Sequence, residues 1–433
     1  MLDRPLTIYS LWKHVPWLLV LCTIIVYTIT QLSGEPIFNS EGFIRRSQES
    51  IFKLSFYTSN RPFTTDFFYK IWGSEPYQVV VGQKIFSVFS WTFLGLAISY
   101  TIRNPILGLL SLITFSTTVL WWNVGGWNNV VRSESLAFSF FALWYGIMIL
   151  VRQTKSRSLF VLLVLVTVFF SFTRDNIPYF LLLFTMLIII YSFLNIEPYF
   201  SKKQWIIYMA IVLIVAVLQS ISVQIGKRHQ FPLINVIFKR VLTYDDRVDF
   251  FKSRGMPVDK EFILRWKDQW ASSHNWDLYK NPKYKPFMDF TVQKGKYVYG
   301  AFLLTHPKYS LQSAWNNHEN ILSNNLYGYT SHPPLEVLVQ ICSGFWNTWV
   351  HLIKKQLLPL FCLVSLLMAK REVFPLIAAI CILVNSFFMY HADAMEVERH
   401  SLIVLIVLAA TSMHLFFIAA DKLYDKVKSW RTV

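Results

Sequence analysis

The feature that most constrains this chain is a series of apolar blocks, each about as long as a helix that crosses a lipid bilayer. Crossing takes about 20 apolar residues, and somewhat shorter stretches serve when the helix tilts or its flanking side chains snorkel. We predict ten spans, at residues 15–32, 77–102, 105–122, 133–151, 159–172, 177–194, 205–226, 356–369, 373–390 and 400–420. The sequence therefore predicts an all-α polytopic membrane protein.

Composition supports this fold class and excludes several others. Of the 433 residues, 54% are hydrophobic and 15% charged, whereas soluble domains carry about 25% charged residues. The net charge of +16 comes mainly from short loops beside the spans, where lysine and arginine fix topology, so nucleic acid is not an expected partner. The four cysteines have no CxxC or Cys/His spacing, which disfavours a disulfide framework and a zinc site. The block at 15–32 lacks a small-residue cleavage site and is expected to be a first anchor.

The distribution of basic residues predicts the topology. With the N-terminus in the cytoplasm, the cytoplasmic segments hold most of the lysines and arginines near the spans, and each short outer connection holds a single arginine. This asymmetry is the positive-inside pattern. It predicts a transmembrane module at 1–226 with a first outer loop at 33–76, a large extracytoplasmic loop at 227–355 forming a small helical cap, and C-terminal helices with a cytoplasmic tail at 356–433. The apolar stretch 335–350 either contributes to the eighth span or lies on the membrane interface.

The three outer arginines run against this charge bias. Arg132, Arg174 and Arg399 each lie at the outer end of a span. Each has acidic neighbours, which are Glu134, Asp175, Glu396 and Glu398. A planar guanidinium at headgroup level is suited to bind a lipid phosphate or pyrophosphate. The alternative is that each arginine pairs with its neighbouring acid and caps a helix end, but three of them on one membrane face favour phosphate binding.

The first outer loop carries two candidate acids. Glu41 lies in the segment GEPIFNSEGFIRRSQES and Asp66 in TSNRPFTTDFFYKIWG. An isolated acid in such a loop is more often a solvated helix cap than a catalyst.

Taken together, these segments resemble the GT-C superfamily of membrane glycosyltransferases. This superfamily includes protein O-mannosyltransferases, lipid A aminoarabinose transferases and mycobacterial arabinosyltransferases. The resemblance covers the order of spans and loops along the whole chain. Locally it depends on NSEGF at 39–43, RPFTTDFFYKIWG at 61–73, RSESLAFSFFAL at 132–143, TRDNIPYFLLL at 173–183 and EVERHSLIVLIVL at 396–408.

The resemblance implies roles for particular residues. Members of the family place a catalytic aspartate just after the first span, four residues before a tyrosine, and counting back from Phe43 puts Asn39 there. Asparagine cannot act as a base, so either Glu41 or Asp66 takes the role, or the chain is not an active transferase of the usual kind. By the same resemblance the three outer arginines hold the phosphate of a polyprenyl-phosphate sugar donor, and Arg61 shapes the site.

The chemistry of such a transfer fits this layout. A base must activate an acceptor hydroxyl, and cations must stabilise the departing lipid phosphate. The family implies inversion at the sugar, and a divalent cation at the acidic motif is possible but not required. The acceptor would be a glycan, lipid or protein, recognised by aromatic and polar side chains of the large loop. His391, Asp393 and His400 are supporting candidates because their short loop is expected at the same outer face.

Three other functions remain open at this point. A transporter or flippase for a lipid-linked glycan would carry ionisable residues or broken helices near the middle of the bilayer, and most predicted spans have uncharged centres. A glycan polymerase or ligase would share the lipid-phosphate site, and a membrane scaffold would leave the outer arginines unexplained. We therefore expect an extracytoplasmic glycosyltransferase in a bacterial inner membrane, with membrane lipids as its surroundings.

Overall fold

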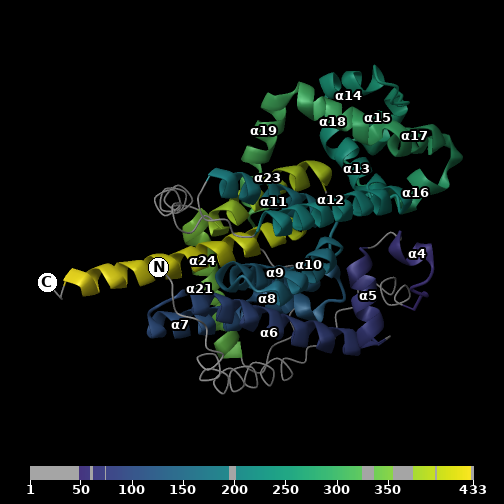
Figure 1. The fold of residues 1–433 in the computed structure, drawn as a ribbon. Coiled ribbons are helices and arrows are strands. Elements are labelled where there is room, and N and C mark those ends of the chain that lie inside the picture. The colour runs from purple at the N-terminus through teal and green to yellow at the C-terminus, as the bar shows by residue number, and fades with distance from the viewer. Residues whose placement is uncertain are drawn as a thin grey trace. The chain divides into compact units, whose positions relative to one another are not determined.

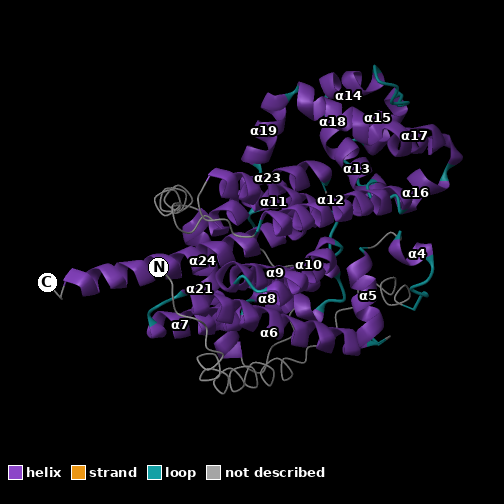
Figure 2. Ribbon diagram, in the orientation of Figure 1, coloured by secondary structure: helices purple, strands orange, loops and turns teal. Residues whose placement is uncertain are grey.

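The described part of the chain is helical throughout. The structure is a computed structural model that describes residues 48–58, 62–73, 75–194, 201–323, 336–354, 374–394 and 397–430. Within these ranges there are helices and short loops and no β-strand (Figure 2). This confirms the predicted helical class, which has a physical reason: a helix satisfies its own backbone hydrogen bonds inside a bilayer.

Five described helices are long and apolar enough to cross a membrane, and a bent pair makes a sixth if it counts as one span. The five are α6 (Pro76–Thr101), α9 (Ser133–Thr154), α12 (Lys202–Ile225), α23 (Phe374–Ala392) and α24 (Val397–Trp430). Two apolar helices are shorter, α10 (Arg157–Ser171) and α11 (Ile177–Leu194). The predicted spans at 15–32 and 356–369 lie outside the described residues. Five or six spans are thus supported, and the total of ten stays a prediction.

The chain divides into two compact units, and each is described by itself. The first comprises residues 1–220, 324–382 and 405–433, and the second comprises 221–323 and 383–404. In the first unit α6 packs against both α7 (Pro105–Ser116) and α9, and α9 packs against α10 (Figure 1). Small residues permit the close approach, because a Cβ on Gly95 would lie 3.0 Å from the Leu112 carbonyl oxygen of α7. Glycine at such crossings is a common device of membrane helix pairs.

Local sequence sets the turn between α6 and α7. The Asn104 side chain accepts hydrogen bonds from the Ile106 and Leu107 amides, and Pro105 occupies the first helical position. Both residue types are favoured there. The Asp421 carboxylate of α24 accepts hydrogen bonds from the amides of Arg103 and Asn104, at 3.1 and 2.8 Å. This turn is therefore tied to the last helix of the chain.

A buried hydrogen-bond network joins three helices of the first unit. The indole of Trp144 in α9 donates to the Tyr208 hydroxyl of α12 at 3.0 Å, and the Thr167 hydroxyl of α10 lies 3.0 Å from the same oxygen. We expect Tyr208→Phe to lower the free energy of unfolding by about 1–3 kcal/mol, because the buried indole N–H loses its acceptor. Thermal unfolding in detergent measures this. Tyr179→Phe is the matched control, since its hydrogen bond to Ser220 is exposed, and an equal loss in both variants would contradict the expectation.

The predicted span at 105–122 is bent in the structure. After α7 the chain forms η1 (Thr117–Leu120), α8 (Trp122–Gly125) and η2 (Gly126–Asn129), and the helix axis turns by 52° between Pro105–Leu120 and Trp122–Asn129. A distant helix, α21 (Glu336–Leu352), packs at this break. Its Ser343 hydroxyl lies 3.1 Å from the Trp122 amide and 3.3 Å from the Leu120 carbonyl, and its Asn347 accepts from the Trp121 indole at 2.9 Å. Polar side chains of α21 thus satisfy groups that the break leaves without helical partners.

The described part of the apolar stretch 335–350 therefore belongs to a helix of the first unit. The Trp346 ring stacks on Trp121 at 5.4 Å between centroids. One turn later the Trp349 indole donates to Ser412 of α24 at 2.9 Å. These contacts place α21 against the apolar helices of its own unit.

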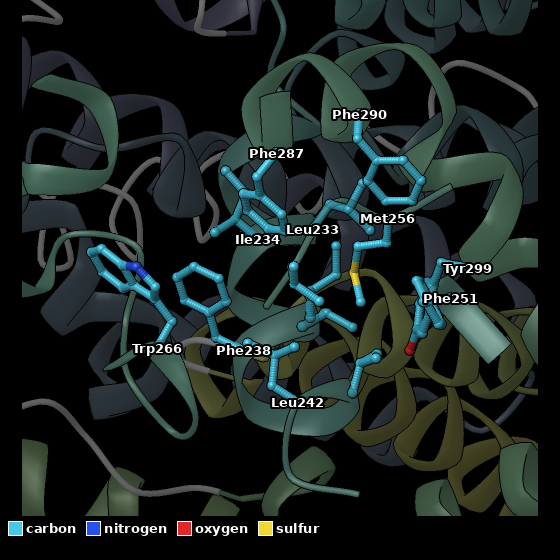
Figure 3. Close-up of a cluster of buried hydrophobic side chains, with 14 of the residues drawn as sticks. Leu233, Ile234, Phe238, Leu242, Phe251, Met256, Trp266, Phe287, Phe290 and Tyr299 are labelled. Atoms are coloured by element: carbon cyan, nitrogen blue, oxygen red, sulfur yellow. The ribbon is translucent and has the colours of Figure 1, made fainter. Parts of the chain in front are cut away.

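The second unit has its own hydrophobic core. Its elements beyond the end of α12 are α13 (Gln230–Val236), η3 (Ile237–Val241), α14 (Asp245–Lys252), α15 (Lys260–Trp266), α16 (Ser273–Lys280), η4 (Pro282–Tyr284), α17 (Lys285–Phe290), η5 (Thr291–Gly295), α18 (Lys296–Thr305), α19 (Pro307–Asn316) and α20 (His318–Ile321). Figure 3 shows Phe238, Phe251, Trp266 and Phe287 among the buried side chains of this core. Such a core supports an independently packed helical unit. Its role as an outer cap stays a prediction.

Candidate functional site

Asp66 lies in a short helix of the first unit, α5 (Phe63–Trp72), which follows α4 (Leu54–Tyr57). The Thr64 hydroxyl donates to the Phe169 carbonyl at 2.7 Å, and the Thr64 amide donates to the Phe172 carbonyl at 3.1 Å. Phe67 stacks on Phe169 with 5.7 Å between ring centroids. The first turn of α5 is therefore fixed against the C-terminal end of α10. Asp66 is almost fully buried there.

A second chain of hydrogen bonds connects α5 to the start of α9. The Tyr69 hydroxyl, one turn after Asp66, donates to the Gln83 side chain of α6 at 3.0 Å. The Gln83 amide then donates to the backbone carbonyls of Asn128 and Val130, at 3.2 and 2.9 Å. Those two residues lead directly into the RSES segment at 132–135. Lys84, the next residue in α6, is also buried.

The segments RSES and TRD meet through a buried ion pair. Arg174 follows the end of α10, and Glu134 is in the first turn of α9. The Arg174 Nη1 atom lies 3.9 Å from the Glu134 Oε1 atom, and both side chains are less than one-tenth exposed. Asp175, the acid next to Arg174 in sequence, accepts a hydrogen bond from Gln219 of α12 at 2.6 Å. This ion pair therefore joins Arg174 to an acid of another helix, Glu134, and does not depend on its sequence neighbour.

These contacts join the elements that carry four buried ionisable residues. Thr64 joins α5 to the end of α10, Tyr69 and Gln83 join α5 to α6 and the entry of α9, and the ion pair joins α9 to the segment after α10. The four elements thus form a closed ring of contacts. We call the ionisable residues that they carry the buried charge cluster, which consists of Asp66, Lys84, Glu134 and Arg174. The two carboxylates and the two cations have no formal net charge together. This lowers the free-energy cost of burying them.

Lys84 was not among the residues that the sequence analysis singled out. It lies two turns inside a predicted span whose remaining residues are almost all uncharged. A single ionisable residue inside a membrane span is a functional candidate by default, because its burial is costly. That signal was available in the sequence.

Among the described residues, Arg132 differs from Arg174 in having no partner for its side chain. It is the residue before α9, its side chain makes no capping hydrogen bond, and it is half-buried. Within the described ranges its guanidinium has neither an ion pair nor a hydrogen bond. A cation at a helix N-terminus also opposes the helix macrodipole. Nothing in the described part of the fold therefore balances this cation.

The second unit holds the other group of predicted residues. The His400 Nε2 atom lies 3.3 Å from an Asp393 carboxylate oxygen and 3.2 Å from the Arg399 Nη2 atom. Arg240 of η3 donates to the carbonyls of Tyr390 and Asp393, so it caps the C-terminal end of α23. This fixes the loop that leads to Arg399. Because Arg399 belongs to a different unit from Arg132 and Arg174, a site shared by all three arginines stays a prediction.

His391 is fixed by hydrogen bonds within this second unit. Its Nε2 atom lies 3.0 Å from the Ser310 carbonyl and its Nδ1 atom 3.4 Å from the Tyr299 hydroxyl. Burial raises the pKa of Tyr299 above its usual value, while the nearby Arg240 opposes part of that shift. Both groups are buried, and the supporting role predicted for His391 stays a prediction.

Several predicted site residues fall outside the described part of the chain. Asn39, Glu41, Arg61 and Glu396 lie outside the described residues, as does the side chain of Glu398. The described ranges contain no group of three His, Cys, Asp or Glu side chains that could hold a metal ion.

In the described part of the first unit, the N-terminus of α9 has no side-chain cap, Arg132 beside it has no partner, and Glu134 of the buried charge cluster lies in the first turn. Backbone N–H groups at such a helix end and a guanidinium fork both bind phosphate oxygens.

Comparison of the sequence with protein-family models and with curated proteins gave no match.

Proposed function

We propose that this protein is a membrane glycosyltransferase that moves a sugar from a polyprenyl-phosphate donor to a glycan, lipid or protein acceptor. The reaction would take place on the extracytoplasmic face of a bacterial inner membrane. The observation that carries the proposal is Arg132, a half-buried guanidinium without a partner in the described ranges, next to the N-terminus of α9.

The donor phosphate fits this position electrostatically. A lipid phosphate carries its charge at headgroup level, where Arg132 and the first-turn amides of α9 could bind it together. Arg174, which pairs with Glu134, is proposed as a second contact to the phosphate, and the ion pair orients the start of α9. When the bond to the sugar breaks, negative charge grows on the phosphate, so these groups stabilise the transition state more than the ground state.

The acceptor hydroxyl needs a base. Glu41 and Asp66 are the two candidates, and the burial of Asp66 among the charge cluster favours a structural role for it. Glu41 is therefore the proposed base, and Arg399 the proposed additional contact to the phosphate. The expected stereochemical outcome is inversion, because one displacement occurs at the sugar carbon.

The base assignment is tested in proteoliposomes with a panel of radiolabelled polyprenyl-phosphate sugars, by measuring the release of polyprenyl phosphate. Glu41→Gln should lower turnover about 10²–10⁴-fold, the contribution of a general base, while donor binding is retained. Asp66→Asn is the comparison variant and should chiefly lower the thermal stability. A fully active Glu41→Gln protein would move the base elsewhere.

A second candidate function is transport of a lipid-linked glycan. Two observations favour it: the 52° break between Pro105–Leu120 and Trp122–Asn129, and Lys84 buried inside α6. Broken helices and intramembrane charges are typical of transporters.

Vesicle assays separate the two candidates. A transferase consumes the donor and releases its lipid phosphate, whereas a transporter moves the intact fluorescent donor between leaflets. Movement without consumption would favour transport, and a Lys84→Met variant that abolishes movement would strengthen that assignment.

A further inference from the structure

Three aromatic side chains of the second unit, the half-buried Phe231 and the exposed Trp276 and Tyr279, form a patch just beyond the end of α12. Phe231 lies in α13, six residues after the last residue of α12. The Trp276 ring is 5.7 Å from the Phe231 ring and 5.6 Å from the Tyr279 ring, between centroids. Trp276 is 47% exposed and Tyr279 is 40% exposed. The patch is therefore assembled but not covered.

The backbone holds Trp276 outside the core of its unit. His274, Asn275 and Trp276 have φ angles of 53°, 56° and 62°, the left-handed region that non-glycine residues seldom adopt. The His274 ring lies edge-on to the buried Trp266 at 5.2 Å. Directly after the turn, Asp277 pairs with Arg265 at 2.8 Å. A strained turn that displays a large apolar ring points to a binding partner for that ring.

The neighbouring helix identifies the partner. α12 meets the length and hydropathy criteria of a span, and only 33% of its most apolar window is buried in the protein. Its last turns still expose Ile221 and Ile225, and Lys227 and Arg228 follow after Gly226. A change from lipid-facing isoleucine to basic residues marks the level of the phospholipid headgroups. Phe231 comes directly after this point, and Trp276 and Tyr279 pack beside it.

We propose that Phe231, Trp276 and Tyr279 form an interfacial anchor that inserts into the headgroup region of the bilayer where α12 leaves it. Tryptophan and tyrosine suit that position because their rings are apolar while the indole N–H and the phenol hydroxyl stay hydrated. The anchor keeps this surface of the second unit at the membrane, beside lipid-linked substrates. It is independent of the reaction that the protein catalyses. A sugar ring stacked on Trp276 is the competing occupant.

A spin label on Lys280→Cys tests the proposal in the full-length protein, after the four native cysteines have been replaced. Lys280 is exposed and follows Tyr279, so the label reports on the patch without removing it. In nanodiscs of phosphatidylcholine and phosphatidylglycerol, oxygen should relax the label several-fold more than a water-soluble nickel complex. The added changes Trp276→Ala and Tyr279→Ala should reverse this preference. Size-exclusion chromatography and thermal unfolding check that each variant is folded.

Trp315→Ala is the matched control. Trp315 is even more exposed, at 73%, and within the described residues its ring stacks on His318 alone, so its removal should leave the oxygen preference unchanged. A label equally accessible to the nickel complex in nanodiscs and in detergent would overturn the anchor. A label that responds instead to added neutral sugars would also overturn it and assign the patch to a glycan.

Discussion

Arg174→Ala is expected to lower the free energy of unfolding by about 3–5 kcal/mol, the usual cost of leaving one member of a buried ion pair without the other. The Glu134 carboxylate lies 3.9 Å from the lost guanidinium, in an environment that is almost closed to water. Thermal unfolding in detergent measures the loss. The double variant Glu134→Leu with Arg174→Met should recover most of it, because apolar residues of similar size often replace a buried pair without cost.

The double variant also separates structure from function. If the ion pair serves only to hold α9 against the segment after α10, the recovered protein should bind its donor as the wild type does. Our proposal predicts weaker donor binding by the folded double variant, since that variant lacks the Arg174 guanidinium that we propose as a second contact to the donor phosphate. A single variant as stable as the wild type would show that the pair contributes neither to folding nor to the position of the site.

Arg132→Gln should have the opposite pattern, with unchanged stability and a large loss of binding. In the described ranges its guanidinium has no ion pair or hydrogen bond to lose, so we expect a stability change within about 0.5 kcal/mol. A charge-assisted hydrogen bond is worth about 1.5–3 kcal/mol, so the affinity for polyprenyl phosphate should fall about 10–150-fold. Microscale binding measurements in detergent test this.

Two further variants serve as controls for Arg132. Arg157→Gln changes an exposed arginine at the first turn of α10, which the predicted topology places at the cytoplasmic end, so it should not alter the affinity. Arg132→Lys keeps the charge but loses the planar fork, and should lie between the wild type and Arg132→Gln. Equal losses for Arg132→Gln and Arg157→Gln would mean that only the overall charge matters.

The sequence alone predicts the helices that are defined by their apolar content. The predicted span 133–151 corresponds to α9 (Ser133–Thr154), and 77–102 corresponds to α6 (Pro76–Thr101). The break after Leu120 was not predicted. The groups that stabilise it, Ser343 and Asn347, lie more than two hundred residues away in the sequence. Hydropathy carries no information on such long-range partners.

The candidate site was predicted in part. Glu134 and Arg174 were both named as candidates, but their pairing across two helices depends on how α9 and α10 pack. Asp66, for which a solvated helix cap was the alternative, is instead buried in α5, within the predicted loop range, because Thr64 and Phe67 dock that helix against α10. Lys84 was not predicted as a site residue, because the mean hydropathy of an apolar span hides a single charged residue. The contributions of Glu41 and Arg399 to a common site remain predictions.

The most direct test of the central claim compares two ligands that differ only in their headgroup. Purified wild-type protein in detergent is titrated with a polyprenyl phosphate and with the corresponding polyprenol. Phosphate recognition by Arg132 predicts at least tenfold tighter binding of the phosphate, a preference that Arg132→Gln should abolish. Equal affinity of the wild-type protein for both lipids would contradict the account.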